Sequence, residues 1–186
     1  MMPAASFEIL WTVANAFSTY LSSTAMPEKN LLRMIQLAEE VFHMRNDPSQ
    51  LSIDESTMEE ILRLHPAAIS EKRDDDGPIA WLIVLPTTSD VMERFLSGEI
   101  SELQILTETD PDDHYDALYL CSVLLLPEYR GKGIARALCS EAIQTILHDH
   151  PIRTLFCWTF SDEGGKLAGS LAKEFHLPLR LRERDA

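Results

Sequence analysis

The sequence is poor in cysteine and in basic residues. Its three cysteines are an odd number, and Cys121, Cys139 and Cys157 each lie within an apolar run. They therefore predict buried thiols rather than a disulfide framework, which is typical of the reducing cytosol. The 16 lysine and arginine residues face 30 acidic residues, which gives a net charge of -14. A field of this sign repels polyanions and argues against nucleic acid or anionic membranes as partners.

Long hydrophobic runs are also missing, and no stretch approaches the length of a transmembrane helix. The first residues contain no basic segment, and Glu8 and Asn15 interrupt their apolar pattern, so we expect no signal peptide. Hydrophobic residues make up 45% of the chain and charged residues 25%, which is ordinary globular composition. A length of 186 residues predicts one domain, residues 1–186, in a cytoplasmic protein.

Apolar periodicity divides the chain into a helical part, residues 1–66, and a part that contains strands, residues 67–186. Helices are expected over residues 6–22, from Glu28 to before Asp47, and over residues 54–64, with Ser52 or Asp54 as the cap of the third. The second part predicts a β-hairpin, a short helix, an ambiguous apolar stretch, an acidic loop, and then alternating strands and helices. The hairpin is expected at 67–72 and 79–85, the short helix at 89–96, the ambiguous stretch at 100–106 and the acidic loop at 107–116. Strands are then expected at 118–126, 154–160 and 179–182, and helices at 134–147 and 166–176.

The most informative segment is residues 127–135, Pro-Glu-Tyr-Arg-Gly-Lys-Gly-Ile-Ala, between an expected strand and an expected helix. A glycine-containing loop at a helix N-terminus exposes backbone N–H groups that the helix cannot satisfy, and these groups bind anions. Arg130 and Lys132 add positive charge. The segment therefore predicts a phosphate or pyrophosphate site. A P-loop is excluded because Ile134 and Ala135 occupy the Lys and Ser/Thr positions, and the dinucleotide fingerprint would need its third glycine at Arg136.

The remaining pattern is Arg-x-x-Gly-x-Ala, at Arg130, Gly133 and Ala135, and it resembles the acyl-CoA pyrophosphate loop of the GNAT superfamily of N-acetyltransferases. The resemblance implies an α/β (α+β) fold with a mixed, mostly antiparallel sheet flanked by helices, here with a helical N-terminal third. It also implies acetyl-CoA as co-substrate, held by the backbone of a strand and by the loop. In this sequence those residues are Val123, Leu124, Leu125, Arg130, Gly131, Lys132, Gly133, Ile134 and Ala135.

The sequence departs from the family pattern in four places. Three helices lead where one strand and two helices are usual, residues 87–116 are inserted, and one C-terminal strand replaces the common two. The tyrosine acid that many members carry in the last helix is missing, because the pattern places Ala172 at that position and Gly165 at the asparagine. Ser170 lies nearby but is a poor acid. The catalytic residues therefore stay unassigned.

Other candidate residues each have a structural alternative. Tyr119 is expected as a packed aromatic, while Ser122 could face the acceptor. His114 and Tyr115 are expected in a solvated loop unless that loop closes over the site. The remaining candidates are read as structural: Cys157 as a core thiol, His148 and His150 around Asp149 as a helix end without a metal, and Arg180, Arg182 and Arg184 as solvated edge charge.

The predicted activity is transfer of an acetyl group from acetyl-CoA to a primary amine of a small cationic molecule or a protein. The acidic net charge and the acidic loop favour a cationic acceptor. The alternative is a catalytically silent acyl-CoA-binding sensor or scaffold. A homodimer is a further possibility, in which the apolar residues Phe7, Trp11 and Phe17 would form a partner surface.

Overall fold

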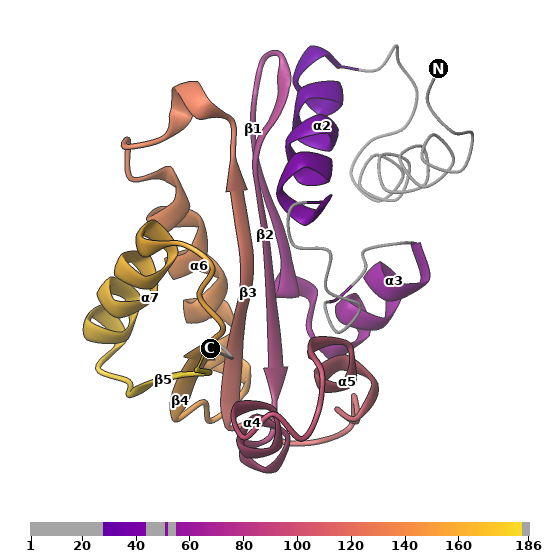
Figure 1. Ribbon diagram of the computed structural model, residues 1–186, viewed down its shortest axis with the longest axis vertical. Helices are drawn as coiled ribbons and strands as arrows, with labels where there is room; N and C mark the ends of the chain where they lie inside the picture. Colours follow the sequence, from indigo (N-terminus) through magenta and orange to yellow (C-terminus); the bar gives the residue numbers. More distant parts are fainter. Residues whose placement is uncertain (1–27, 44–50, 52–54, 184–186) are drawn as a thin grey trace.

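The computed structural model describes residues 28–43, 51 and 55–183 (Figure 1). The expected helix over residues 6–22, the possible caps Ser52 and Asp54, and Arg184 lie outside the described residues. The first strand of the family pattern, if it lies before residue 28, lies outside them as well. None of the helices in the described residues is long and apolar enough to cross a membrane.

In the part of the chain that the structure describes, two helices precede the sheet, and they correspond to the second and third of the three helices that the sequence predicts. Helix α2 spans Lys29–His43 and α3 spans Glu55–Leu64. A short 3-10 turn, η1 (Pro66–Ala68), then leads into the first strand, with His65 as its N-cap. The His65 ring accepts a bond from the Ala67 amide at Nδ1 and lies 3.0 Å from the Asp149 carboxylate at Nε2. His65 therefore connects the start of the sheet to Asp149, 84 positions later, at the C-terminal end of helix α6 (Ile134–Asp149).

The predicted hairpin is confirmed as β1 (Ile69–Asp74) and β2 (Gly77–Thr87). Every residue of β2 is buried, which confirms the expectation that both faces of this strand are covered. The described residues form one five-stranded sheet in the order β1-β2-β3-β4-β5, in which β3 spans Ala117–Leu125, β4 spans Thr154–Cys157 and β5 spans Leu179–Leu181. The pairs β1–β2 and β2–β3 are antiparallel, while β3–β4 and β4–β5 are parallel. The expected mixed sheet is therefore confirmed, with antiparallel pairing confined to the first three strands.

The insertion between β2 and β3 contains two helices, α4 (Ser89–Leu96) and α5 (Glu102–Thr107). The ambiguous stretch 100–106 is thus helical. Its helix begins with a capping box, in which the Ser101 side chain accepts from the Gln104 amide and the Gln104 side chain accepts from the Ser101 amide. The loop that follows folds back on the insertion, because Asp116 accepts bonds from both the amide and the hydroxyl of Ser89.

The second half runs β3 (Ala117–Leu125), η2 (Pro127–Tyr129), α6 (Ile134–Asp149), β4 (Thr154–Cys157), α7 (Asp162–Phe175) and β5 (Leu179–Leu181). Two boundaries in this half differ from the sequence-based expectation by more than two residues. Strand β4 ends at Cys157, three residues before the predicted end, because the chain turns away to reach α7. Helix α7 begins at Asp162 instead of Lys166, since Ser161 caps it through a 3.1 Å bond from the Gly164 amide.

Helices cover both faces of the sheet. Figure 1 shows α6 and α7 on one face and α2 and α3 on the other. A large core cluster includes Leu118, Ile143 and Phe156, and a smaller one joins Met34 of α2 to Trp81 of β2. The alternating side chains of β2 thus contribute to both clusters, which explains why a strand with no polar face is stable in this position.

Candidate functional site

The loop before α6 has the geometry of an anion cradle. Gly131 and Gly133 adopt left-handed backbone conformations, with φ of 73° and 77°. Gly133 is the N-cap of α6 and makes no side-chain capping bond. The first amide of this helix to bond to the N-cap carbonyl is that of Ala137, so the N–H groups of the preceding turn have no intrahelical acceptor. No heavy atom lies within 4 Å of a Cβ built on either glycine, so the space beside the loop is open.

Two cations beside these N–H groups have no acidic partner. Arg130 and Lys132 are exposed, and neither forms an ion pair within the described parts of the chain. The Arg130 Nε donates to the Leu125 carbonyl at 3.3 Å, and the Lys132 ammonium lies 5.2 Å from the Tyr129 ring centre. Together with the positive end of the α6 dipole, these groups can receive a doubly charged phosphate.

Side chains from α2 and the β1–β2 hairpin hold this loop in place. Tyr129 donates its hydroxyl to the Asp74 carboxylate, and Arg33 pairs with Glu128 at 2.6 Å. The hydrogen bond from Tyr129 lowers the pKa of Asp74, and the bond from Arg33 lowers that of Glu128 to about 2. Both carboxylates are therefore charged at neutral pH, and the loop is preorganised before any ligand binds.

A second feature lies where β3 and β4 separate. β4 pairs only with the first three residues of β3, Ala117 to Tyr119, so this β3 edge has no partner strand beyond Tyr119 among the described residues. Cys121 is the extra residue of a β-bulge, because Ile83 pairs with Ser122 while Val84 pairs with Leu120. A bulge increases local twist, which directs β3 away from β4. The result is an open cleft between the two strands, with β3 as one wall.

The walls of this cleft come from β3, the end of β4 and α7. Val123 and Ser122 lie on one side, and Trp158 and Leu167 on the other. All three cysteines of the chain line the same cleft, although they are far apart in the sequence. Burial raises the pKa of Cys139 to about 12 and that of Cys157 to about 11, so neither is a reactive thiolate at neutral pH. The interpretation of Cys157 as a core thiol agrees with this environment.

The indole N–H of Trp158 is buried and has no hydrogen-bond partner among the described groups. Its ring contacts Phe160 at 4.7 Å between centroids and the Arg182 guanidinium at 4.7 Å. Arg182 also lies 4.6 Å from the Phe95 ring centre, so it is sandwiched between aromatic rings. The expectation that Arg182 is solvated edge charge is therefore wrong, whereas Arg180 forms an exposed pair with Glu93 at 2.6 Å.

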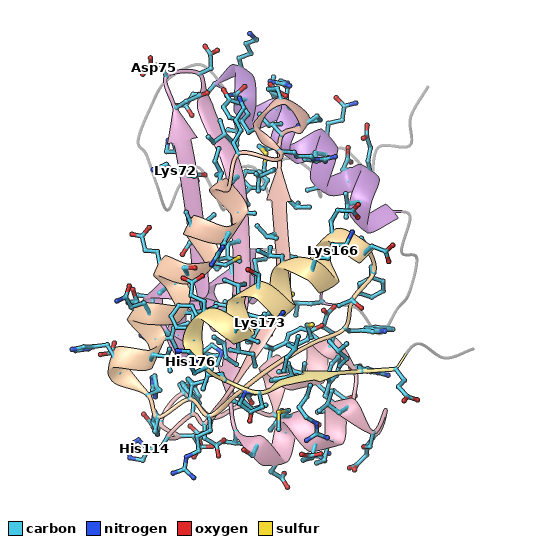
Figure 2. The ribbon with its side chains drawn as sticks, turned by 90° about the vertical axis from the view of Figure 1, so that its left-hand side faces the viewer. Lys72, Asp75, His114, Lys166, Lys173 and His176 are labelled. Atoms are coloured by element: carbon cyan, nitrogen blue, oxygen red, sulfur yellow. The ribbon has the colours of Figure 1, made fainter. Side chains whose placement is uncertain are left out.

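The acidic loop does not reach the cleft. The acidic loop leads into the first residue of β3, whereas the loop at Arg130 follows the last residue of β3. Figure 2 shows His114 and Asp75 of the hairpin at opposite ends of the molecule. His114 is exposed as expected. Tyr115 is not solvated: it is 0% exposed, stacks on His150 at 4.4 Å and donates to the Asp110 carbonyl. Burial raises its pKa to about 12, which makes it a poor acid at neutral pH.

Tyr119 is fully buried between Phe95 and Phe156, which confirms the prediction of a packed aromatic. Its hydroxyl donates to Glu102 at 2.7 Å. Sequence analysis did not select Glu102, because the stretch around it was ambiguous. The capping-box pattern Ser-x-x-Gln from Ser101 was the available signal, since it favours a helix that begins at residue 102. Nothing local indicates that this glutamate is buried.

No group of histidine, cysteine and acidic residues in the described ranges has the arrangement of a metal site. Asp149 instead pairs with His148 at 2.8 Å and with His65 at 3.0 Å. At the position of the missing tyrosine, Ala172 is buried in the core. The cleft lining contains hydroxyl and thiol groups but no carboxylate, ammonium, guanidinium or imidazole among the described residues.

A loop that can bind a pyrophosphate, a cleft between diverging strands and a helix on each side define an acyltransferase-type fold. Comparison with family models identifies the family: the model of the acetyltransferase (GNAT) family matches residues 38–168. The chain belongs to this family. Searches of curated proteins and of solved structures found no match.

Proposed function

We propose that this chain is an acetyl-CoA-dependent N-acetyltransferase that acts on a primary amine. The observation that carries the proposal is the open loop at Gly131 and Gly133, which leads directly from the strand that forms one wall of the cleft. One extended ligand can therefore place its phosphates on the loop and its thioester in the cleft. Family membership supports the same chemistry.

In this proposal, residues Arg130 to Ala135 bind the pyrophosphate. N–H groups of the loop and of the α6 N-terminus donate hydrogen bonds to the phosphate oxygens, and Arg130 and Lys132 neutralise the phosphate charge. The pantetheine arm lies along β3 from Val123 to Leu125, where it replaces the missing strand partner through backbone hydrogen bonds. Val123 lines the cleft, which agrees with this path.

The acyl transfer needs a positioned amine and a stabilised oxyanion. The acceptor loses a proton, its nitrogen attacks the thioester carbonyl, and a carbon–nitrogen bond forms as the carbon–sulfur bond breaks. Coenzyme A leaves as a thiolate and takes up a proton. Backbone N–H groups of β3 at the cleft are suited to stabilise the oxyanion. The buried N–H of Trp158 is a further donor for a ligand oxygen in the cleft.

Calorimetric titration with acetyl-CoA tests the binding step, with dephospho-CoA and ATP in parallel. Gly133→Asp places a carboxylate at the proposed phosphate position and should weaken acetyl-CoA by about 100-fold. Gly133→Asn is the matched control, because asparagine has the same shape without the charge and also tolerates a left-handed backbone. Equal affinities of the two variants, or no binding to the unmodified protein, would refute the assignment.

A catalytically silent acyl-CoA sensor is the second candidate function. Two observations favour it: the helix α7 carries alanine in place of the usual tyrosine, and the cleft lining holds no strong acid or base. Release of free thiol from acetyl-CoA in the presence of a panel of primary amines separates the two. Tight acetyl-CoA binding without amine-dependent thiol release would favour the sensor.

A further inference from the structure

A buried carboxylate lies directly behind the wall of the cleft. Glu102, the first residue of α5, is only 3% exposed. One of its oxygens accepts the Leu51 amide at 2.9 Å. The other accepts the Tyr119 hydroxyl at 2.7 Å and the Cys121 thiol at 3.7 Å. Three neutral donors therefore converge on one buried carboxylate.

Among the described residues, the Glu102 carboxylate has no cationic partner. All three donors are neutral groups, and within residues 28–43, 51 and 55–183 no lysine, arginine or histidine forms an ion pair with Glu102. A buried charge without a partner is costly, and hydrogen bonds from neutral donors offset only part of that cost. A positively charged ligand nearby would compensate the negative charge of the Glu102 carboxylate.

The cleft is the place where such a ligand would enter. Cys121 lines the cleft and is partly exposed, and its thiol contacts the Glu102 carboxylate. Burial raises the pKa of the Tyr119 hydroxyl, and the nearby Glu102 raises this pKa further. The thiols of Cys121 and Cys157 raise the same pKa by smaller amounts. Glu102 and Tyr119 thus lie behind the cleft wall, and Cys121 connects them to the cleft where β3 and β4 separate. A negative potential in this low-dielectric place is weakly screened by salt.

We propose that Glu102 is a specificity-determining residue that attracts the ammonium group of a cationic acceptor to the Cys121 end of the cleft. The proposal rests on the proposed function and names the acceptor class as a primary alkylammonium. It also replaces the acidic loop as the source of selectivity, because no residue of that loop lines the cleft, whereas Glu102 contacts Cys121, which does. A purely structural role for Glu102 would need its hydrogen bonds but not its charge.

The test measures the potential at Cys121 with two thiol reagents of similar size and opposite charge. These are the trimethylammonio-ethyl and the sulfonato-ethyl methanethiosulfonates, with modification of Cys121 followed by peptide mass spectrometry. The ratio of the two rates cancels the intrinsic reactivity of the thiol, which depends on its own ionisation. The same ratio for 2-mercaptoethanol provides the reference for a thiol in water.

The unmodified protein should favour the cationic reagent by about tenfold over the reference, and most of this preference should persist in about 1 M salt. Glu102→Gln should remove it, whereas Glu99→Gln, an exposed charge on the same insertion, should leave it unchanged. A preference no larger than the reference, or no modification of Cys121 by either reagent, would overturn the proposal even if Glu102→Gln did not fold.

Acetyl-CoA titration of the same variants keeps this proposal separate from the proposed function. Glu102→Gln should bind acetyl-CoA within about twofold of the unmodified protein, because Glu102 forms no contact with the loop at Arg130. Loss of the rate ratio with normal acetyl-CoA binding supports the role of Glu102. A failure of acetyl-CoA to bind the unmodified protein would refute the proposed function, and a persistent rate ratio in Glu102→Gln would refute only the role of Glu102.

Discussion

Two glycines that differ only in backbone conformation provide a direct test of the loop geometry. Gly133 has a φ of 77°, whereas Gly169 lies inside helix α7. A Cβ built on either residue meets no heavy atom within 4 Å. Substitution by alanine is therefore free of steric conflict at both positions, and the backbone alone determines the outcome.

The expected effects have opposite signs. Alanine in the left-handed region costs about 1–2 kcal/mol. The reduced entropy of the unfolded chain returns about 0.4–1 kcal/mol, so Gly133→Ala should lower the free energy of unfolding by about 1 kcal/mol. In a helix interior, alanine is better than glycine by about 1 kcal/mol, so Gly169→Ala should raise the free energy of unfolding by a similar amount.

Urea unfolding of the full chain, followed by tryptophan fluorescence, measures both changes. The midpoint should fall for Gly133→Ala and rise for Gly169→Ala, with the slope of each transition unchanged. A rise in the midpoint for Gly133→Ala would show that residue 133 does not adopt the left-handed conformation. The description of the anion cradle would then be wrong, whatever the affinity for acetyl-CoA.

Three further outcomes follow from burial and ionisation. In the same urea assay, Ile143→Ala should lower the free energy of unfolding by about 2–5 kcal/mol, because Ile143 is buried. Gln144→Ala, at an exposed position, should change this free energy by no more than about 0.5 kcal/mol. Similar changes in the two variants would contradict the core position of α6. Cys139, with a pKa of about 12, should resist alkylation by iodoacetamide at pH 8 in the native protein and react after denaturation. Because the Glu128 pKa falls from 4.5 to about 2 beside Arg33, this pair stabilises the fold above pH 4.5 and loses its effect as the pH falls toward 2. The stability difference between unmodified protein and Arg33→Gln should therefore shrink over that range, and a difference that grows would contradict the pairing.

Local patterns predicted the order of elements and the position of the glycine loop between β3 and α6. Signals within a few neighbouring residues determine the β1–β2 hairpin, the strand before residue 127 and the helix after Gly133. Such signals can be read directly from the sequence. The early start of α7 was missed because Gly164 and Gly165 argue against a helix. Ser161 and the acids that follow it were the stronger signal.

Long-range placement could not be predicted in the same way. The three cysteines lie on different elements, and only the sheet and α6 bring them to one cleft. Tyr115 belongs to an acidic loop by sequence, yet His150, 35 positions later, provides the ring that buries it. The burial of Glu102 depends in the same way on Leu51 and Tyr119, which are distant in sequence. The hydrophobic periodicity of a sequence does not indicate contacts between residues that are distant along the chain.

The complete burial of β2 has a consequence for the unfolded chain. Residues 79–85, Ile-Ala-Trp-Leu-Ile-Val-Leu, combine high β-propensity with no charge, which is the composition of segments that form intermolecular β-structure. Pro78 and Pro86 flank this segment, and neither can donate a backbone hydrogen bond to an added strand. These prolines therefore act as gatekeepers against aggregation during synthesis and refolding, before the two helical layers have covered the strand.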